Sequence, residues 1–502
     1  MREARPIPVA RAEGFYRWDT VLFPTIQFGI FFPIVFIGSW LLRPQPHRWK
    51  LFMIAASYVF YAFAFKGSWL PWESGTRWKY PALLMLVTVV DQIFVVGIFK
   101  ARSPLTKKLW VRVAVVANLG VLAYFKYYNF GRDNFGPLLS WLPKRQVILP
   151  VAISFFIFQA LSYVIDAYRG KVKPTQLVDF ATYLCFFPHL VAGPIVRATE
   201  FLPQLRTRPD PRFIDASHAF RLIIAGMFKK VVISAYLSHS IADKVFTNPK
   251  GHSALEVLFG IYAYALQIYA DFSGYTDIAI GVALLIGIRF PKNFDSPYVA
   301  ISLQDFWRRW HMSLSRWLRD YLYISLGGNR RGTARTYINL ALTMLIGGLW
   351  HGAAWRFVIW GGIHGLGLAI ERFIGERRGA RGDMGIERGF LPARLVGWVV
   401  TFHIVCFAWI FFRAEKLQLA FDILGRLVTG WGSPSPLVTP LLLAVLVLMI
   451  LSQFVPEKVM KAVQYRFSRF PVVLQGLTLA ACFFFISRLA PIGVQPFIYF
   501  QF

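Results

Sequence analysis

The stretch VLFPTIQFGIFFPIVFIGSWLL, residues 21–42, decides the fold class. It is 22 residues long and contains no charged side chain. A helix of about 20 apolar residues crosses the hydrocarbon core of a bilayer, and no small-residue cleavage pattern marks this run as a removable signal peptide. We therefore expect residues 1–20 to form an N-terminal lead and residues 21–502 to form a single integral membrane domain.

The composition of the 502-residue chain supports a membrane protein. Apolar residues make up 56% and charged residues only 16%, whereas about a quarter of a soluble chain is charged. The net charge of +30 could suggest nucleic acid, but the basic residues lie in short runs between apolar segments, as in 43–50 and 100–112. This pattern is typical of cytoplasmic loops that face anionic lipid. We expect membrane lipid and no nucleic acid as a partner.

Further apolar runs predict an all-α polytopic protein with about 11–13 transmembrane or re-entrant helices, together with interfacial amphipathic helices. The run 255–288 is too long for one span, and its polar middle, DFSGYTD (271–277), predicts a break or two helices. The basic loops after the first and third spans should both be cytoplasmic, which places the N-terminus outside. The other runs are 51–65, 81–99, 111–125, 147–165, 178–196, 220–237, 338–350, 355–370, 395–412, 437–455 and 472–486.

Polar residues first concentrate in residues 302–328. Ser302 and Asp305 have the spacing of a capping box, so a helix should begin there, and Gly327-Gly328 should end it. At 100° per residue, one face carries Leu303, Phe306, Trp310, Leu314, Trp317 and Tyr321, and the other carries Arg308, His311, Ser315 and Arg319. The cationic neighbours of His311 favour its neutral, proton-accepting form. A basic helix lying at the membrane interface is the alternative.

The second concentration is GGLWHGAAW, residues 347–355. It places His351 at membrane depth between glycines, which allow close approach of other backbones and leave the imidazole open to a substrate. We interpret His351 as functional and His364, thirteen residues further on, as structural.

Several chemistries lack their signatures in this sequence. There is no G-x-x-x-x-G-K-[ST] loop, no G-x-S-x-G elbow and no H-E-x-x-H pair. Cys185, Cys406 and Cys482 form neither a disulfide framework nor a metal pattern, and we expect no metal site. A histidine acting as a general base inside the membrane remains.

The motifs around these histidines resemble the membrane-bound O-acyltransferase superfamily. The motifs are DFSGYTDIAIG (271–281), NFDSPYVAISLQDFWRRWHMSLSRWLRDYLYISLGGNRRG (293–332) and NLALTMLIGGLWHGAAW (339–355). LPVAISFFIFQALSYVIDAYRG (149–170), FFPHLVAGPIVR (186–197) and QPFIYFQF (495–502) resemble its bacterial alginate O-acetyltransferase-like branch.

The resemblance implies a core with a central funnel, with its motifs within residues 149–370, in a bacterial cell membrane. It implies transfer of an acyl group, usually acetyl, from a cytoplasmic thioester to an extracytoplasmic polysaccharide, commonly through an SGNH-type partner transferase. The donor would be acetyl-coenzyme A or another acyl thioester, with an acyl carrier protein as the alternative source, and no cofactor would be bound.

The resemblance also assigns residues by motif. His351 matches the catalytic histidine of the family and His311 the second histidine of the bacterial branch. Arginine pairs well with phosphate, although these arginines also fit ordinary cytoplasmic loop charge. The candidates for donor or substrate binding are Arg308, Arg309, Ser315, Arg319, Asn329, Arg330, Arg331 and Trp350. Asp271, Ser273, Tyr275 and Asp277 should form a structural polar network between helices rather than catalyse.

Three alternative functions stay open on the sequence alone. The superfamily includes proteins for D-alanylation of teichoic acids, which take their donor from a carrier protein. A glycan transporter would show internal repeats, and the sequence shows none. A non-catalytic scaffold would have no need of His351 among glycines.

Overall fold

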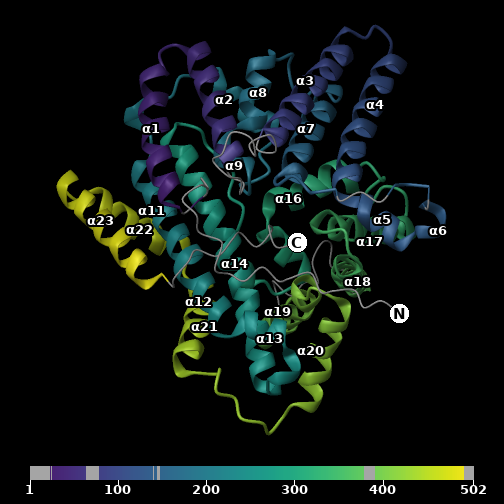
Figure 1. The fold of residues 1–502 in the computed structure, drawn as a ribbon, viewed down its shortest axis with the longest axis vertical. Coiled ribbons are helices and arrows are strands. Elements are labelled where there is room, and N and C mark those ends of the chain that lie inside the picture. The colour runs from purple at the N-terminus through teal and green to yellow at the C-terminus, as the bar shows by residue number, and fades with distance from the viewer. Residues whose placement is uncertain are drawn as a thin grey trace.

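The computed structural model describes residue 23 and residues 25–63, 78–139, 141–143, 147–377 and 391–490. The predicted N-terminal lead and the motif at 495–502 lie outside these residues. The described chain is helical and contains no strand (Figure 1). The α-helices are α1 Ile26–Leu42, α2 Pro46–Phe63, α3 Lys79–Lys100, α4 Pro104–Leu122, α5 Tyr128–Asn134, α6 Gly136–Leu139, α7 Ile153–Tyr168, α8 Leu177–Cys185, α9 Phe187–Leu190, α10 Ala198–Phe201, α11 Ala216–Met227, α12 Ala235–Leu237, α13 Asp243–Thr247, α14 Ala254–Leu285, α15 Leu303–Arg309, α16 Met312–Trp317, α17 Thr333–His351, α18 Trp355–Arg377, α19 Leu391–Arg413, α20 Leu417–Thr429, α21 Pro440–Gln453, α22 Glu457–Ser468 and α23 Val472–Leu489.

Short 3-10 and π-helical turns interrupt or extend these helices. The 3-10 turns are η4 Leu202–Leu205, η5 Pro211–Phe213, η8 Pro249–Gly251 and η9 Pro297–Val299. The π-helical turns are η3 Ala123–Tyr127, η6 Phe228–Ser234, η7 Ser238–Ala242 and η10 Leu318–Tyr323.

The predicted class, an all-α polytopic membrane protein, is confirmed. In the described part of the chain, six helices are long and apolar enough to cross a membrane, and the pair α21 and α22, bent by 93°, would add a seventh. Other predicted runs form shorter pieces: 178–196 divides into α8 and α9, and 220–237 into α11, η6 and α12. The six helices are Lys79–Lys100, Pro104–Asn134, Ala254–Leu285, Trp355–Arg377, Leu391–Arg413 and Val472–Leu489.

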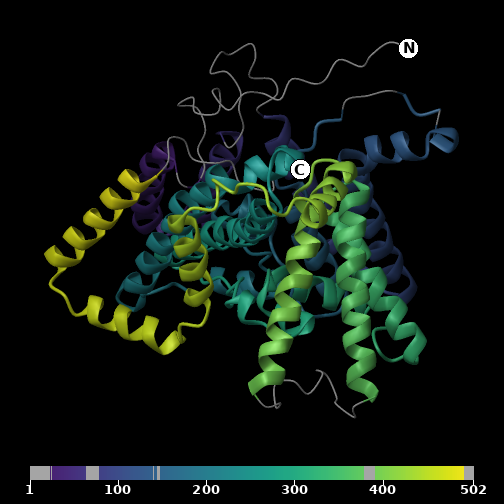
Figure 2. The ribbon, with the colours of Figure 1, turned by 90° about the horizontal axis from the view of Figure 1, so that it is seen from below.

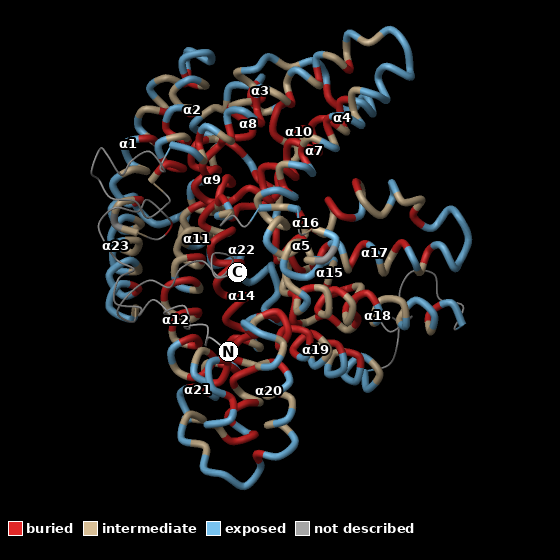
Figure 3. Tube along the Cα trace, turned by 45° about the vertical axis from the view of Figure 1, so that its right-hand side comes forward, coloured by how far each residue is buried: buried red, intermediate tan, exposed pale blue. Residues whose placement is uncertain are grey.

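The central helix α14 is continuous, so the predicted break in 255–288 is wrong. Its polar residues are paired within the protein: Asp271 forms an ion pair with Lys230, and Asp277 with Lys229. A carboxylate that is paired inside the protein does not require the helix to open at membrane depth. In its most apolar window, 89% of α14 is buried, and Figure 3 shows this buried path through the molecule.

Glycines set the contact between α11 and α14. A methyl group built on Gly226 would come within 2.6 Å of the Gly274 carbonyl oxygen, and one built on Gly274 within 2.7 Å of the Gly226 carbonyl oxygen. Small residues allow helices in a membrane to approach this closely. The close contact brings Lys229 and Lys230 to the carboxylates of α14.

The segment 302–328 begins as predicted but is not one helix. Ser302 Oγ accepts a hydrogen bond from Asp305 N at 3.0 Å, and α15 begins at the next residue. The helix ends at Arg309, because Trp310 is extended and His311, the next residue, has a φ of +41°, in the left-handed region. The predicted apolar face is buried. The predicted polar face is wrong at His311, which is completely buried instead.

Candidate active site

His351 is the last residue of α17 and faces the turn into α18. The two helices pack closely: a methyl group on Gly348 would collide with the Phe357 carbonyl, and one on Gly361 with the Met344 carbonyl. The sequence predicts this close approach from the same glycines. In Figure 2, α18 and α19 run toward the lower edge, whereas α5 and α6 lie near the upper edge.

A cavity of about 120 Å³ lies beside His351. Trp350 and His351 contribute to its wall from the end of α17, and Lys126 contributes from η3. The rest of the wall is Val191 together with the segment before α7 and the first turn of α7; the lining residues there are Leu149, Pro150, Val151, Ala152, Ile153, Ser154 and Phe155. The cavity therefore combines an imidazole, a lysine amine and apolar side chains, and small-molecule sites commonly place a few polar groups among apolar ones in this way.

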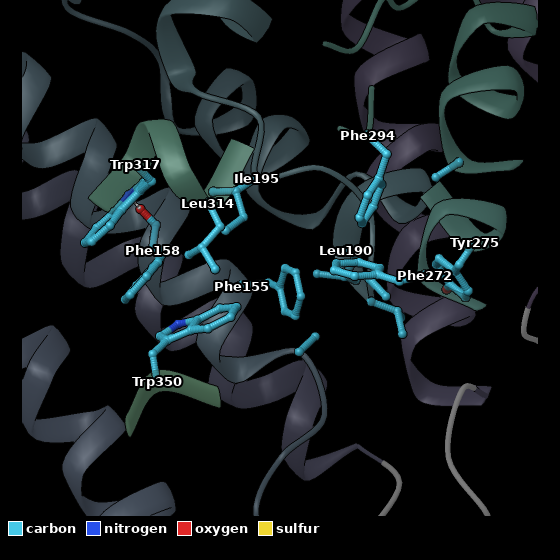
Figure 4. Packing of buried hydrophobic residues seen from close by; sticks show 14 of the residues in the cluster. Phe155, Phe158, Leu190, Ile195, Phe272, Tyr275, Phe294, Leu314, Trp317 and Trp350 are labelled. Atoms are coloured by element: carbon cyan, nitrogen blue, oxygen red, sulfur yellow. Dashed lines mark hydrogen bonds between the residues drawn. The ribbon is translucent and has the colours of Figure 1, made fainter. Parts of the chain in front are cut away.

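Aromatic rings fix the positions of the two side chains from α17. The His351 ring lies 4.9 Å from the Trp360 ring and 5.0 Å from the Trp350 ring, measured between centroids. Trp350 in turn packs 5.2 Å from Phe158, which stacks on Trp317 at 3.7 Å. Figure 4 shows this row of rings beside Phe155. Rigid packing of this kind holds a reactive group in a defined orientation.

His311 and His351 both lie close to the Trp350 ring. The Trp350 ring centroid is 6.3 Å from the His311 ring and 5.0 Å from the His351 ring. His311 lies outside the candidate membrane spans, and its complete burial lowers the pKa of the imidazole to about 3. The ring is therefore neutral, as predicted, but because of burial. The predicted cause, neighbouring arginines, is wrong: Arg309 forms an ion pair with Asp305 at 2.7 Å.

One hydrogen-bond acceptor determines the tautomer of His311. Asn293 Oδ1 lies 3.2 Å from His311 Nδ1 and also accepts a hydrogen bond from Ser313 N at 3.1 Å. A backbone N–H can only donate, so this amide atom is the oxygen and His311 Nδ1 must carry the proton. His311 Nε2 is then unprotonated, and it has no hydrogen-bond partner among the described residues.

The residues predicted to bind the donor lie apart from the cavity, except for Trp350. Arg308, Asn329, Arg330 and Arg331 are exposed. The last three precede α17, whose 19 residues put them roughly 27 Å from His351 along the helix. Arg319 is exposed and pairs with Asp320 at 2.7 Å, and Ser315 Oγ donates to the Trp310 carbonyl at 3.2 Å.

The four residues of the predicted polar network lie on α14. Besides the two ion pairs of Asp271 and Asp277, Lys229 Nζ donates to Ser273 Oγ at 3.0 Å. Tyr275 is buried, and its ring lies 4.9 Å from the ring of Phe23. These contacts join α14 to η6 and the N-terminal segment, and none of the four residues lines the cavity beside His351.

Sequence reasoning missed Lys126 and Asn293. Lys126 directly follows an apolar run that ends at residue 125, so it resembles an ordinary interfacial charge in the sequence. Asn293 lies inside a quoted motif, but nothing in its spacing from His311 indicates a contact between the two side chains. Only the left-handed turn at His311 brings them together.

A comparison with known protein families identifies the family of this chain. Residues 74–411 match the family "MBOAT, membrane-bound O-acyltransferase family". The chain belongs to this family. It is a multi-pass membrane O-acyltransferase, as the resemblance implied, and this replaces the transporter and scaffold alternatives.

Individual relatives of this O-acyltransferase are similar over most of its length. It is 40% identical to the probable alginate O-acetylase AlgI of Azotobacter vinelandii, over 78% of this chain and 74% of the relative. It is 37% identical to the peptidoglycan O-acetyltransferase of Helicobacter pylori, over 79% of this chain and 78% of the relative. The teichoic acid D-alanyltransferase of Streptococcus thermophilus is 26% identical over 59% of this chain and 80% of the relative. The expected alginate O-acetylase-like branch is confirmed.

Proposed function

We propose that this enzyme moves an acetyl group from acetyl-coenzyme A in the cytoplasm across the membrane for O-acetylation of a cell-envelope polysaccharide, through a partner transferase that supplies the acceptor hydroxyl. The single observation that carries the proposal is the position of His351 in the wall of a cavity of about 120 Å³. The names of two relatives, alginate O-acetylase and peptidoglycan O-acetyltransferase, both specify O-acetylation of a carbohydrate polymer. We assign the reaction to one integral membrane domain, residues 21–502.

His351 is the general base in this proposal. Its imidazole removes the proton from the acceptor hydroxyl as the oxygen attacks the thioester carbonyl. The tetrahedral intermediate then collapses, the carbon–sulfur bond breaks, and the leaving thiolate takes the proton from the imidazolium. Products are an acetyl ester and a free thiol, and His351 returns to its neutral form.

His311, whose ring centroid lies 6.3 Å from that of Trp350, supports this proton transfer. Its unprotonated Nε2 can accept a hydrogen bond from the acceptor or from a water molecule in the proton path. Its place between α15 and α16 is rigid, because Met312 N donates to the Asn293 carbonyl at 2.8 Å. His311 therefore orients the reaction, while His351 contacts the reacting atoms.

Charge distribution supports a cytoplasmic donor. Lys126 comes near the end of the candidate span Pro104–Asn134, and its ammonium contacts the end of α17. We propose that the start of that span and the start of α17, which Arg330 and Arg331 precede, lie on the same side, because the two helices meet near their other ends. Both starts are rich in basic residues, which favours the cytoplasmic side. The exposed arginines could receive coenzyme A phosphates there.

The acceptor side lies at the opposite end of α17. An SGNH-type transferase outside the membrane would receive the acetyl group and pass it to the polysaccharide. D-alanyl transfer from a carrier protein is the second candidate, supported by the 26% identity to a teichoic acid D-alanyltransferase. The 40% identity to an alginate O-acetylase, over a larger share of this chain, favours acetyl transfer.

The reaction can be tested with purified enzyme in liposomes. Acetyl-coenzyme A labelled in the acetyl group is supplied with alginate or peptidoglycan fragments, with and without a candidate SGNH-type partner, and both thioester loss and label on the glycan are measured. We expect enzyme-dependent thioester loss with acetyl-coenzyme A and none with a D-alanyl carrier protein. Turnover with the carrier protein alone would contradict the proposal and support D-alanyl transfer.

A further inference from the structure

The end of α17 is capped by two consecutive side chains from another element. Tyr127 Oη donates a hydrogen bond to the Leu349 carbonyl at 2.8 Å. Lys126 Nζ donates to the Trp350 carbonyl, and it lies 3.4 Å from the His351 carbonyl oxygen. The last four carbonyls of an α-helix have no partner within the helix. Because the Gly348 carbonyl accepts from Gly352 N, all four of these carbonyls in α17 are bound.

The π-helical turn η3 explains how two neighbouring residues reach the same helix end. In an α-helix, the side chains of residues i and i+1 do not share a face. Lys126 and Tyr127 belong to η3, a π-helical turn between α4 and α5, and both reach α17. Single π-helical turns within helices are frequent at functional sites. Here the turn joins the end of one span to the residue that we propose as the general base.

Lys126 also belongs to the wall of the cavity. Its ammonium lies 3.3 Å from Ser154 Oγ, and Lys126, Ser154 and His351 all line the cavity. Lys126 takes part in none of the ion pairs that form between the described residues. Its charge is therefore set against the carbonyl end of α17, where a cation is favourable. The ammonium group has three N–H donors, and it has three acceptors nearby: the Trp350 carbonyl, the His351 carbonyl and Ser154 Oγ.

We infer that Lys126 and Tyr127 are positioning residues, which fix the end of α17 and thereby hold the His351 imidazole in the cavity. The inference rests on the proposed function of His351. Neither residue is proposed to contact substrate, because the N–H and O–H groups of their side chains already donate to carbonyl and hydroxyl oxygens of the protein. A displacement of about 1 Å in a catalytic group can cost on the order of 100-fold in rate, so the loss of this cap should appear in kcat.

The experiment compares Lys126→Met and Tyr127→Phe with the native enzyme in liposomes. We expect Lys126→Met to lower kcat by about 10- to 100-fold and Tyr127→Phe by about 3- to 10-fold. The KM for acetyl-coenzyme A should stay at the native value, because substrate binding is not removed. In the double variant the loss should be smaller than the product of the two single losses, since both side chains hold the same helix end.

Two matched variants control for the substitutions. Lys107→Met removes an exposed lysine from the same span, and Tyr128→Phe removes a hydroxyl that donates to the Pro143 carbonyl at 2.7 Å. Both should keep the native kcat. If Lys126→Met fails to fold, Tyr127→Phe and its control complete the comparison.

A second readout separates this inference from the proposed function. The rate at which diethyl pyrocarbonate modifies His351, followed by mass spectrometry of its peptide, does not depend on turnover. We expect faster modification in both variants, because the end of α17 is no longer fixed. Native kcat together with native modification rates would overturn the positioning role. A raised KM with unchanged kcat would also overturn it. Absence of turnover in the native enzyme would instead contradict the proposed function.

Discussion

The amide oxygen of Asn293 fixes which nitrogen of His311 carries the proton. It accepts from His311 Nδ1 and from both donors of Ser313. Replacing Asn293 with leucine removes this acceptor, so the ring can rotate or change tautomer, and Nε2 is no longer held unprotonated. We expect Asn293→Leu to lower kcat at least about 10-fold, since a correctly oriented acid–base group contributes about 10²- to 10⁴-fold. Turnover per folded protein is the measurement.

Ser313→Ala is the matched control for Asn293→Leu. It removes one hydrogen bond to Asn293 and leaves the Ile195 amide without its Ser313 acceptor, but it keeps the bond between Asn293 and His311. We expect a lower melting temperature with kcat near the native value. Equal loss of kcat in both variants would show that this region affects the enzyme only through stability.

In the contact between helices α17 and α18, two neighbouring glycines differ in how much room they leave for a methyl group. A methyl group on Gly361 would meet backbone atoms of Met344 and Leu345, whereas one on Gly362 would meet only the Leu345 side chain, at 3.8 Å. Backbone atoms cannot move without separating the helices. We expect Gly361→Ala to destabilise the enzyme by about 1–3 kcal/mol and to reduce turnover by displacing His351. Melting temperature in detergent and turnover measure the two effects.

Gly362→Ala tests whether these effects depend on helix contact. Alanine favours a helix over glycine by about 1 kcal/mol, and the added methyl group fits at this position. We expect native turnover and an unchanged or slightly raised melting temperature. Similar losses in the two alanine variants would contradict the close contact between α17 and α18.

At the scale of the whole molecule, the sequence predicts the membrane fold, the cap at Ser302 and the burial of the apolar face after it. These features depend on local patterns of apolar and capping residues. It does not predict the continuity of α14 or the turn at His311. Those depend on contacts between residues far apart in the chain, such as Lys230 with Asp271, and on one residue in the left-handed region.

The residues of the candidate site were also predictable only in part from the sequence. Both histidines and Trp350 could be chosen from their motifs, and the structure places them around one tryptophan ring. Lys126 reaches His351 across 225 residues of sequence, so no local pattern could indicate it. Of the arginines chosen for donor binding, Arg330 and Arg331 lie at the opposite end of α17, where only their charge relates them to the reaction.

The role of His351 is tested by comparing the turnover of the native enzyme with that of His351→Ala, with His403→Ala as a control. His403 is an exposed histidine on α19. Each protein is reconstituted at equal folded amount, and loss of labelled acetyl-coenzyme A is followed. We expect His351→Ala to lose about 10²- to 10⁴-fold in kcat, while His403→Ala keeps the native value. Native kcat in His351→Ala, with acetyl transfer intact, would contradict the assignment of His351 as the general base.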